Sequence, residues 1–149
     1  MAQTNDPVGK LNELIRGIGI VTLTTIRPDG SLHSCPMAAH EADPAGAVWL
    51  ISDNNTEKVE AVKTIPRVNL SFADHAAQRY VSISGFCELV RDHNKAKQLW
   101  SSSYKAWFPG GLDDPNLILM KIDVQHAEYW DSAANRMVEV AGFNKPPIE

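Results

Sequence analysis

Long apolar runs and a surplus of positive charge are both absent from this sequence of 149 residues. The longest apolar stretches, such as residues 117–120, are far shorter than the roughly 20 residues that span a bilayer. The formal net charge of -4 provides no overall positive field for a nucleic-acid backbone. We therefore expect neither membrane insertion nor nucleic-acid binding.

Cysteine is also scarce, because the chain contains only Cys35 and Cys87. No basic segment followed by an apolar segment occurs near the start, so we expect a cytoplasmic protein. Two thiols in such a protein are usually reduced, although the sequence leaves a single disulfide between them open. His33 and Cys35 would share one face of a strand, but two ligands do not make a metal site, and no metal is expected.

The composition that is present is typical of a folded domain, with 44% hydrophobic and 21% charged residues. A chain of this length can bury a sizeable core without disulfides or metals. We therefore predict one domain over residues 1–149, with residues 132–149 as a peripheral C-terminal segment.

Three short helices are predicted from capping patterns and apolar spacing. Asp6 and Pro7 begin the first helix as N-cap and first helical residue. Asn54 starts a capping pattern for the second helix, over about residues 55–65. Asp92 caps the third.

Six strands are predicted from β-branched runs and alternating polarity between Gly and Pro turns. The first three are expected to form an antiparallel meander, and a brief further strand fits residues 137–140, before a loose tail at 144–147. Strands and helices do not alternate regularly, which predicts a mainly β protein: an antiparallel six-stranded β-barrel with peripheral helices. The six predicted strands are residues 18–26, 31–41, 47–52, 68–73, 80–90 and 117–124.

The segment from Ser52 to Lys58 is the strongest candidate for an anion site. It runs from a buried strand into a helix start, where free N–H groups, the hydroxyls of Ser52 and Thr56 and the ammonium of Lys58 suit a phosphate. An ordinary capped helix with an exposed lysine explains the same residues.

A second candidate is the strand that contains Pro36, around residues 33–37. Proline removes a ladder donor, so this strand is expected at an edge or a bulge where a flat ligand can meet the backbone. An edge strand with a bulge and no ligand is the alternative.

Aromatic residues form a third group. Trp100 is expected in the core, whereas Trp107 and Phe108 lie in a Gly-Pro loop and need another surface to cover them. A dimer interface or a stacked ring system would cover them, and so would an interface without any ligand.

Taken together in order, these segments resemble the general stress protein 26 group of the pyridoxamine 5′-phosphate oxidase-like flavoproteins, from about Leu11 to Asp131. The resemblance depends on the order and spacing of short motifs, at residues 23–25, 29–34, 36–37, 49–52 with Lys58, 81–85, 99–100, 107–111, 113–115 and 129–131.

The resemblance implies a split β-barrel of the FMN-binding type, a homodimer with two flavin sites at the subunit interface. It implies that the backbone of residues 34–37 borders the flavin ring, that residues 50–52 line the ring and ribityl chain, and that residues 56–58 hold the phosphate. The partner subunit would contribute Trp107 and Trp130. The cofactor-binding residues implied are Ser34, Cys35, Pro36, Met37, Leu50, Ile51, Ser52, Thr56, Glu57, Lys58, Trp107 and Trp130.

One departure concerns Cys35, which stands where the family often has arginine before the Pro-Met pair. Without that cation, FAD is an alternative to FMN. The expected activity is an FMN-dependent oxidoreductase of unassigned substrate, with NAD(P)H or another electron donor. A flavin-binding or flavin-sensing protein without turnover is the alternative, and residues that would hold pyridoxal phosphate as substrate are not found.

Overall fold

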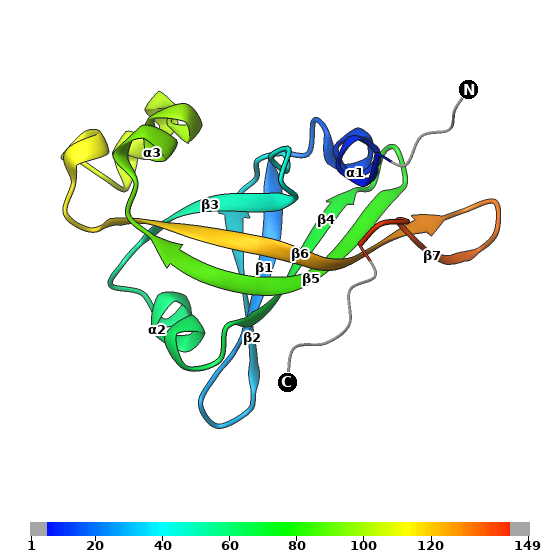
Figure 1. The fold of residues 1–149 in the computed structure, drawn as a ribbon, viewed down its shortest axis with the longest axis horizontal. Helices are drawn as coiled ribbons and strands as arrows, with labels where there is room; N and C mark the ends of the chain where they lie inside the picture. The colour runs from blue at the N-terminus through cyan, green and yellow to red at the C-terminus, as the bar shows by residue number, and fades with distance from the viewer. Residues whose placement is uncertain (1–5, 144–149) are drawn as a thin grey trace.

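A computed structural model describes residues 6–143, in which one antiparallel sheet curls into an open barrel with helices at its rim (Figure 1). The α-helices are α1 (Pro7–Ile15), α2 (Glu57–Thr64) and α3 (His93–Leu99), and the 3₁₀ helices are η1 (Ser102–Ala106) and η2 (Gly111–Asp113). The strands are β1 (Ile20–Ile26), β2 (Leu32–Ala38), β3 (Ala47–Asp53), β4 (Arg67–Asp74), β5 (Arg79–Val90), β6 (Leu117–Asp131) and β7 (Arg136–Glu139).

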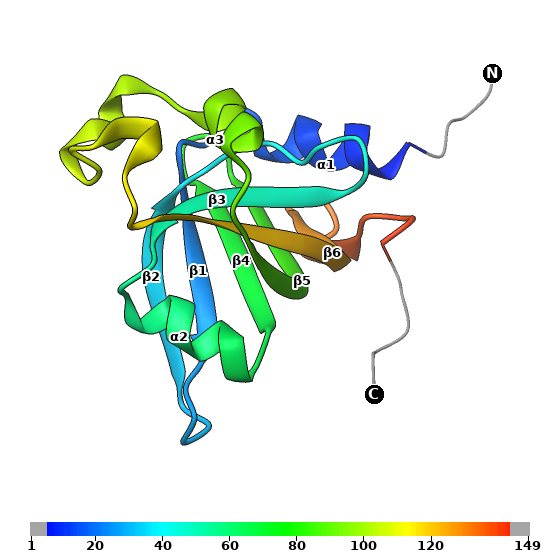
Figure 2. The same cartoon turned by 60° about the vertical axis from the view of Figure 1, so that its left-hand side comes forward.

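The strand order is β2-β1-β4-β5-β6-β3, and β7 pairs with β6 outside this path. Strands β2 and β3 therefore stand at the two ends of the main sheet. They approach one another as the sheet curls, but they do not pair (Figure 2). The barrel is split between β2 and β3.

The long strand β6 joins the edge strand β3 to the rest of the sheet, because it pairs with β3 on one side and with β5 on the other. Its first half pairs with β3, from Ala47↔Asp123 to Asp53↔Leu117, and most of its length pairs with β5. The register of β5 against β6 shifts between Ser84 and Gly85. A Cβ at Gly85 would lie 2.4 Å from the carbonyl oxygen of Asp123, so only glycine allows the strands to approach this closely at the bulge.

Two apolar clusters hold the fold. The inner one fills the barrel and contains fully buried side chains from five strands, among them Leu23, Leu50, Leu70, Ile83 and Met120. The outer one packs α3 and η1 against the other face of β3 and contains Trp49, Ile51, Ala96, Tyr104, Phe108 and Leu119. Strand β3 is thus buried on both faces.

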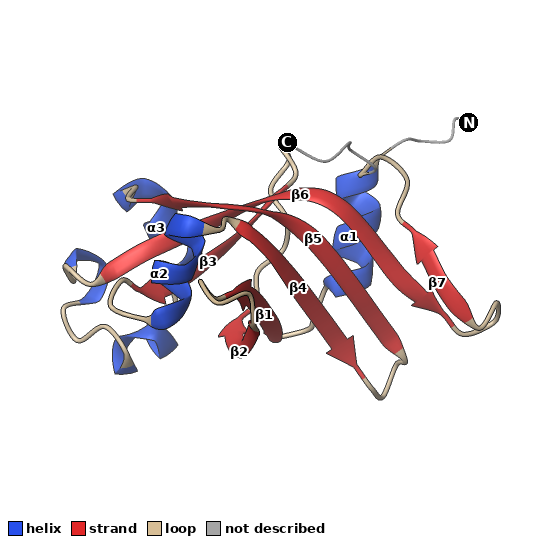
Figure 3. Ribbon diagram, turned by 90° about the horizontal axis from the view of Figure 1, so that it is seen from below, coloured by secondary structure: helices blue, strands red, loops and turns tan. Residues whose placement is uncertain are grey.

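The outward-facing side of the sheet, across β2, β1, β4 and β5, carries mostly uncharged side chains, and Arg67 at the start of β4 is a charged exception. We call this side the uncharged face. The paired positions Thr22↔Pro36, Thr24↔Ser34 and Thr22↔Ser71 place its members side by side. Figure 3 shows these strands together with α1, which contacts β5, and α2, which contacts β1 and β5. The members, all exposed or half-buried, are Ile20, Thr22, Thr24, Ser34, Pro36, Ala38, Asn69, Ser71, Ser82 and Ser84.

Much of the predicted secondary structure is confirmed. Helix α1 begins after Asp6, whose carboxylate accepts a hydrogen bond from Gly9 N–H at 3.0 Å, and Asp92 caps α3 by accepting from Lys95 N–H at 3.1 Å. Pro36 lies on an edge strand as predicted, and the short strand near residues 137–140 is β7. Both cysteines are free.

The predicted meander of the first three strands is wrong. Strand β3 pairs with β6 and not with β2. An apolar strand that is buried on both faces needs a partner within the sheet, and the long β6 supplies it, whereas β2 carries a proline and remains an edge.

Two boundaries and the burial of one residue also differ from prediction. The N-cap of α2 is Thr56 and not Asn54, whose N–H instead donates to Asn116 O at 2.7 Å. Strand β6 continues to Asp131 because β5 and β7 pair with its second half. Phe108 is buried in the outer cluster, so only Trp107 of that pair is left uncovered. The predicted tail at residues 144–147 lies outside the described residues.

Candidate functional site

The split brings together two of the three groups that the sequence singled out, the strand around Pro36 and the segment from Ser52 to Lys58. Strand β2, the C-terminal end of β3 and the first turn of α2 border it, and we call this place the split site (Figure 2). Residues far apart along the chain meet here because the two edge strands close the barrel without pairing. Their unpaired backbone edges are the groups that a bound ligand can reach.

Strand β2 presents two different faces at the split site. His33, Cys35 and Met37 are half-buried on the inner face, whereas Ser34 and Pro36 are exposed on the uncharged face. The Ser34 hydroxyl lies 2.7 Å from the hydroxyl of Thr24 on β1, and Cys35 Sγ lies 4.0 Å from Met37 Sδ. A ligand beside this strand would meet its backbone and the inner side chains.

Strand β3 contributes little side-chain surface to the split site. Leu50 is fully buried in the inner cluster, Ile51 is buried in the outer cluster, and the Ser52 side chain is also buried. The Ser52 hydroxyl is 3.3 Å from the carbonyl oxygen of Asp53. At residues 50–52 the unpaired backbone edge is therefore the surface offered to a ligand.

The start of α2 offers backbone donors. Thr56 Oγ1 donates to Asp53 O at 2.8 Å and makes no capping bond to the helix. The N–H groups of Glu57, Lys58 and Val59 have no acceptor within residues 6–143. Free N–H groups at a helix start, with the positive end of the helix dipole, favour an anion there.

Glu57 is engaged by a cation that the sequence analysis did not include. Its carboxylate forms an ion pair with Arg27 from the β1–β2 turn. The hydrogen bond from Arg27 lowers the pKa of Glu57 against the opposing effect of desolvation, and the charge of His33 contributes to the lowering. The side chain of Glu57 is thus neutralised by Arg27, and only its N–H is suited to an anion.

Lys58 and Cys35 are neighbours across the split site. Burial raises the pKa of the Cys35 thiol, and the positive charge of Lys58 opposes that increase. The thiol is therefore neutral near pH 7 and is a poor nucleophile. Lys58 forms no ion pair with any residue in the described part of the chain, so its charge is available to a ligand.

The sequence places His33 on the same strand face as Cys35 and raises the two as metal ligands, but His33 is not among the predicted cofactor-binding residues. Its Nδ1 atom is buried and has no hydrogen-bond partner among the described residues. The sequence gives no signal for this unpartnered nitrogen. The ion pair between Arg27 and Glu57 had no signal in the sequence, because 30 residues separate the partners.

The two tryptophans of the predicted site lie in distant parts of the chain. Trp107 follows η1 and is 70% exposed, whereas Trp130 is half-buried on β6, where it pairs with Met137 of β7. The η1–η2 segment and β7 are at opposite ends of the molecule (Figure 1). The structure does not bring Trp107 and Trp130 together within one chain.

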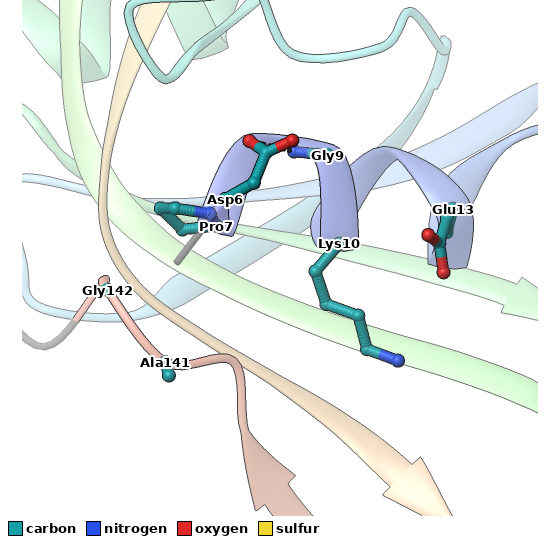
Figure 4. A pocket seen from close by; sticks show the side chains of 7 residues that line it. All are labelled: Asp6, Pro7, Gly9, Lys10, Glu13, Ala141 and Gly142. Carbon is teal, nitrogen blue, oxygen red and sulfur yellow. Dashed lines mark hydrogen bonds between the residues drawn. The ribbon is translucent and has the colours of Figure 1, made fainter. Parts of the chain in front are cut away.

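Two surface hollows lie away from the split site. One of about 310 Å³ is bordered by residues 17–20 and 73–75. The other, of about 610 Å³, lies between the first turns of α1 and the chain after β7, with the Lys10 and Glu13 side chains extending from the helix (Figure 4). It is lined by Asp6, Pro7, Gly9, Lys10, Glu13, Ala141 and Gly142.

Within residues 6–143, no helix is long and apolar enough to cross a bilayer. The same residues contain no group of three or more His, Cys, Asp or Glu side chains arranged to hold a metal ion.

Comparison with known proteins gives a consistent result. Residues 6–149 match the model of the family described as pyridoxamine 5′-phosphate oxidase like. Protein bli-3 of Neurospora crassa is 27% identical over 110 residues, which cover 67% of this chain and 53% of that protein. General stress protein 26 of Bacillus subtilis is 25% identical over 79 residues, which cover 51% of this chain and 56% of that protein. The chain spans about half the length of these curated relatives.

Solved structures show the same fold. General stress protein 26 from Bacillus anthracis superposes with a TM-score of 0.75 at 22% identity, covering 89% of this chain and 97% of that one. The general stress FMN/FAD binding protein from Xanthomonas citri superposes with a TM-score of 0.71 at 26% identity, covering 98% of this chain and all (100%) of that one. The predicted split β-barrel is confirmed.

Proposed function

Since this chain belongs to the pyridoxamine 5′-phosphate oxidase-like family, we propose that it binds FMN at the split site and acts as an FMN-dependent oxidoreductase. The observation that carries the proposal is the strand order, which puts β2 and β3 at the two ends of the sheet. Helix α2 follows β3 directly, so its unbonded N–H groups lie beside this opening. The Xanthomonas citri structure, of an FMN/FAD binding protein, supports a flavin as the ligand.

The residues of the split site fit a flavin phosphate. Three N–H groups at the start of α2 lack acceptors, and Lys58 lacks an ion-pair partner among the described residues. Glu57 would repel a phosphate, but Arg27 neutralises its carboxylate. We expect Thr56, Glu57 and Lys58 to hold the phosphate through the helix start and the Lys58 ammonium, and the backbone of residues 34–37 and 50–52 to border the ring.

Bound FMN supplies hydride or electron transfer, which protein side chains alone do not provide. The chain's own residues would bind the cofactor, orient it and exclude water from it. Cys35 is neutral and Glu57 is tied to Arg27, so neither is suited to move a proton. The substrate remains unassigned, and NADH or NADPH is the electron donor that we would test first.

A homodimer is part of the proposal, because the uncharged face is suited to contact with a second copy. The ten neighbouring side chains of this face carry no charge, so burying them avoids the desolvation penalty of ions, and their hydroxyl and amide groups can hydrogen-bond across an interface. Trp130 lies on β6, on the same outward-facing side as His126 and Glu128. Strand β6 is next to β5, at the border of the uncharged face. A partner's Trp107 and Trp130 would complete the flavin site.

Two measurements test the proposal. The absorption spectrum of the purified protein should show a flavin, and liquid chromatography of the heat-released ligand should identify FMN rather than FAD. Light scattering should give twice 16.4 kDa. Ser71→Glu places a charge in the uncharged face of both copies and should yield a monomer, whereas Ala76→Glu, at an exposed position of the β4–β5 turn outside this face, should remain dimeric. A flavin-free, monomeric parent that takes up no added FMN would refute the proposal.

A non-catalytic flavin carrier or sensor is the second candidate. It is favoured by the lack of a suitable acid or base in Cys35 and Glu57. Anaerobic addition of NADH, NADPH or dithionite separates the two. Bleaching by a nicotinamide supports the oxidoreductase, while bleaching by dithionite alone supports the carrier.

A further inference from the structure

We propose that His33 is a direct ligand of the flavin phosphate, donating a hydrogen bond from Nδ1. This inference rests on the proposed function and deepens it, because it adds a second side chain, from the opposite wall of the split site, to the phosphate contacts of α2.

The unpartnered ring nitrogen is the first observation. His33 Nδ1 is buried and is the one buried side-chain nitrogen or oxygen atom within residues 6–143 that has no hydrogen-bond partner. Buried polar atoms in folded proteins nearly always have a partner, so an exception calls for an explanation, and a water, an ion or a bound ligand can complete the bond. An imidazole can present Nδ1 as a donor in the Nδ1–H tautomer or when protonated.

Strand register is the second observation. His33 lies on the inner face of β2, opposite Thr25 of β1, a side chain that is 1% exposed. Cys35 lies two residues further along the same face, roughly 6.6 Å away at 3.3 Å per residue. Cys35 is in turn the neighbour of Lys58. His33 is therefore within the row of inner side chains that faces α2.

The charges around His33 are the third observation. Glu57 of α2 interacts with His33, because its lowered pKa reflects Arg27 first and the charge of His33 to a smaller extent. Because Arg27 already satisfies that carboxylate, His33 is left with its buried nitrogen free. An anion between β2 and the start of α2 would accept from His33, Lys58 and the free N–H groups together.

The test measures FMN and riboflavin affinities of the full-length protein by fluorescence titration. His33→Ala should weaken FMN binding about 10-fold or more and change riboflavin binding less than about 2-fold, since riboflavin lacks the phosphate. His33→Gln, which keeps a donor, should recover part of the loss. His93→Ala removes an exposed histidine of α3 and should change neither affinity.

A measurement on the unaltered protein does not depend on how the variants fold. The Nδ1 resonance of His33 in ¹⁵N NMR should shift on addition of FMN but not of riboflavin. Equal losses of both ligands in His33→Ala, or an unshifted resonance, would overturn the assignment to the phosphate. If the parent protein binds neither flavin, the proposed function itself fails, and the inference fails with it.

Discussion

Lys58→Ala gives the most direct test of where the phosphate is held. Lys58 lies in the first turn of α2, half-buried, and has no ion-pair partner among the described residues, so its removal breaks no existing ion pair. Any loss of FMN affinity would then come from the ligand contact itself. A charge-assisted hydrogen bond contributes roughly 1.5–3 kcal/mol, which corresponds to about a 10- to 150-fold weaker FMN complex.

The assay compares two ligands in one variant. Flavin fluorescence titration gives the Kd of FMN and of riboflavin, and only the FMN value should rise. Lys63→Ala is the matched control, because Lys63 is on the same helix but is exposed and paired with Glu60 at 2.8 Å. It should leave both values unchanged.

Two results would refute the reasoning. Unchanged FMN affinity in Lys58→Ala would make Lys58 a solvated helix residue. A parallel loss of riboflavin affinity would show that the substitution loosens the barrel instead of removing a phosphate contact.

Three further predictions follow from other residues. Cys35→Arg adds a second cation beside Lys58 and should raise the ratio of FMN to riboflavin affinity about 10-fold in the same titration; an unchanged ratio would contradict the placement of the phosphate near Cys35. Phe108→Ala opens the outer cluster and should lower the free energy of unfolding by about 3 kcal/mol or more in urea, against less than about 0.5 kcal/mol for Trp107→Ala in the flavin-free protein. Burial, assisted by the charge of Lys95, lowers the pKa of His40 from its ordinary value of 6.5. As the pH falls, His40 is therefore protonated in the unfolded chain before it is protonated in the folded protein. Stability should be full above pH 6.5 and fall by at most about 1.4 kcal/mol per pH unit as the pH drops from 6.5 toward the lower pKa of the folded state, and His40→Gln should flatten this dependence in urea titrations at each pH.

The local features of the fold were predictable from the sequence because they depend on neighbouring residues. Asp6 and Asp92 cap helices within three residues of themselves, and the β1–β2 hairpin closes over a short Pro-Asp-Gly turn. Pro36 predicted an edge strand through its missing N–H alone. Each of these signals acts over a few residues.

The pairing of distant strands was not predictable in the same way. Alternating or continuous apolar residues mark β3 as a buried strand, but nothing in residues 47–53 indicates whether its partner is β2 or β6. The end of β6 was misjudged for a related reason, since its later half is polar on one face and is held by β5 and β7.

In the candidate site, too, features that depend on local motifs were predicted and features that depend on distant contacts were not. Lys58 and Cys35 were singled out as site residues from motifs, and the fold places them together. The side chains of Leu50 and Ile51 are buried in two different clusters, so residues 50–52 would line a ligand through their backbone. Arg27 and the orphaned nitrogen of His33 emerge only from tertiary contacts.

The late position of β6 in the chain has a consequence for how the protein folds. Strand β3 is complete by Asp53, but its only strand partner in the described structure begins at Leu117. During synthesis the backbone of β3 must therefore wait without a strand partner until most of the chain has left the ribosome. Pairings between such distant segments slow folding and expose unpaired strands to aggregation. A nascent chain that stops before residue 117 should accordingly depend on chaperones, whereas the finished chain encloses β3 on both faces.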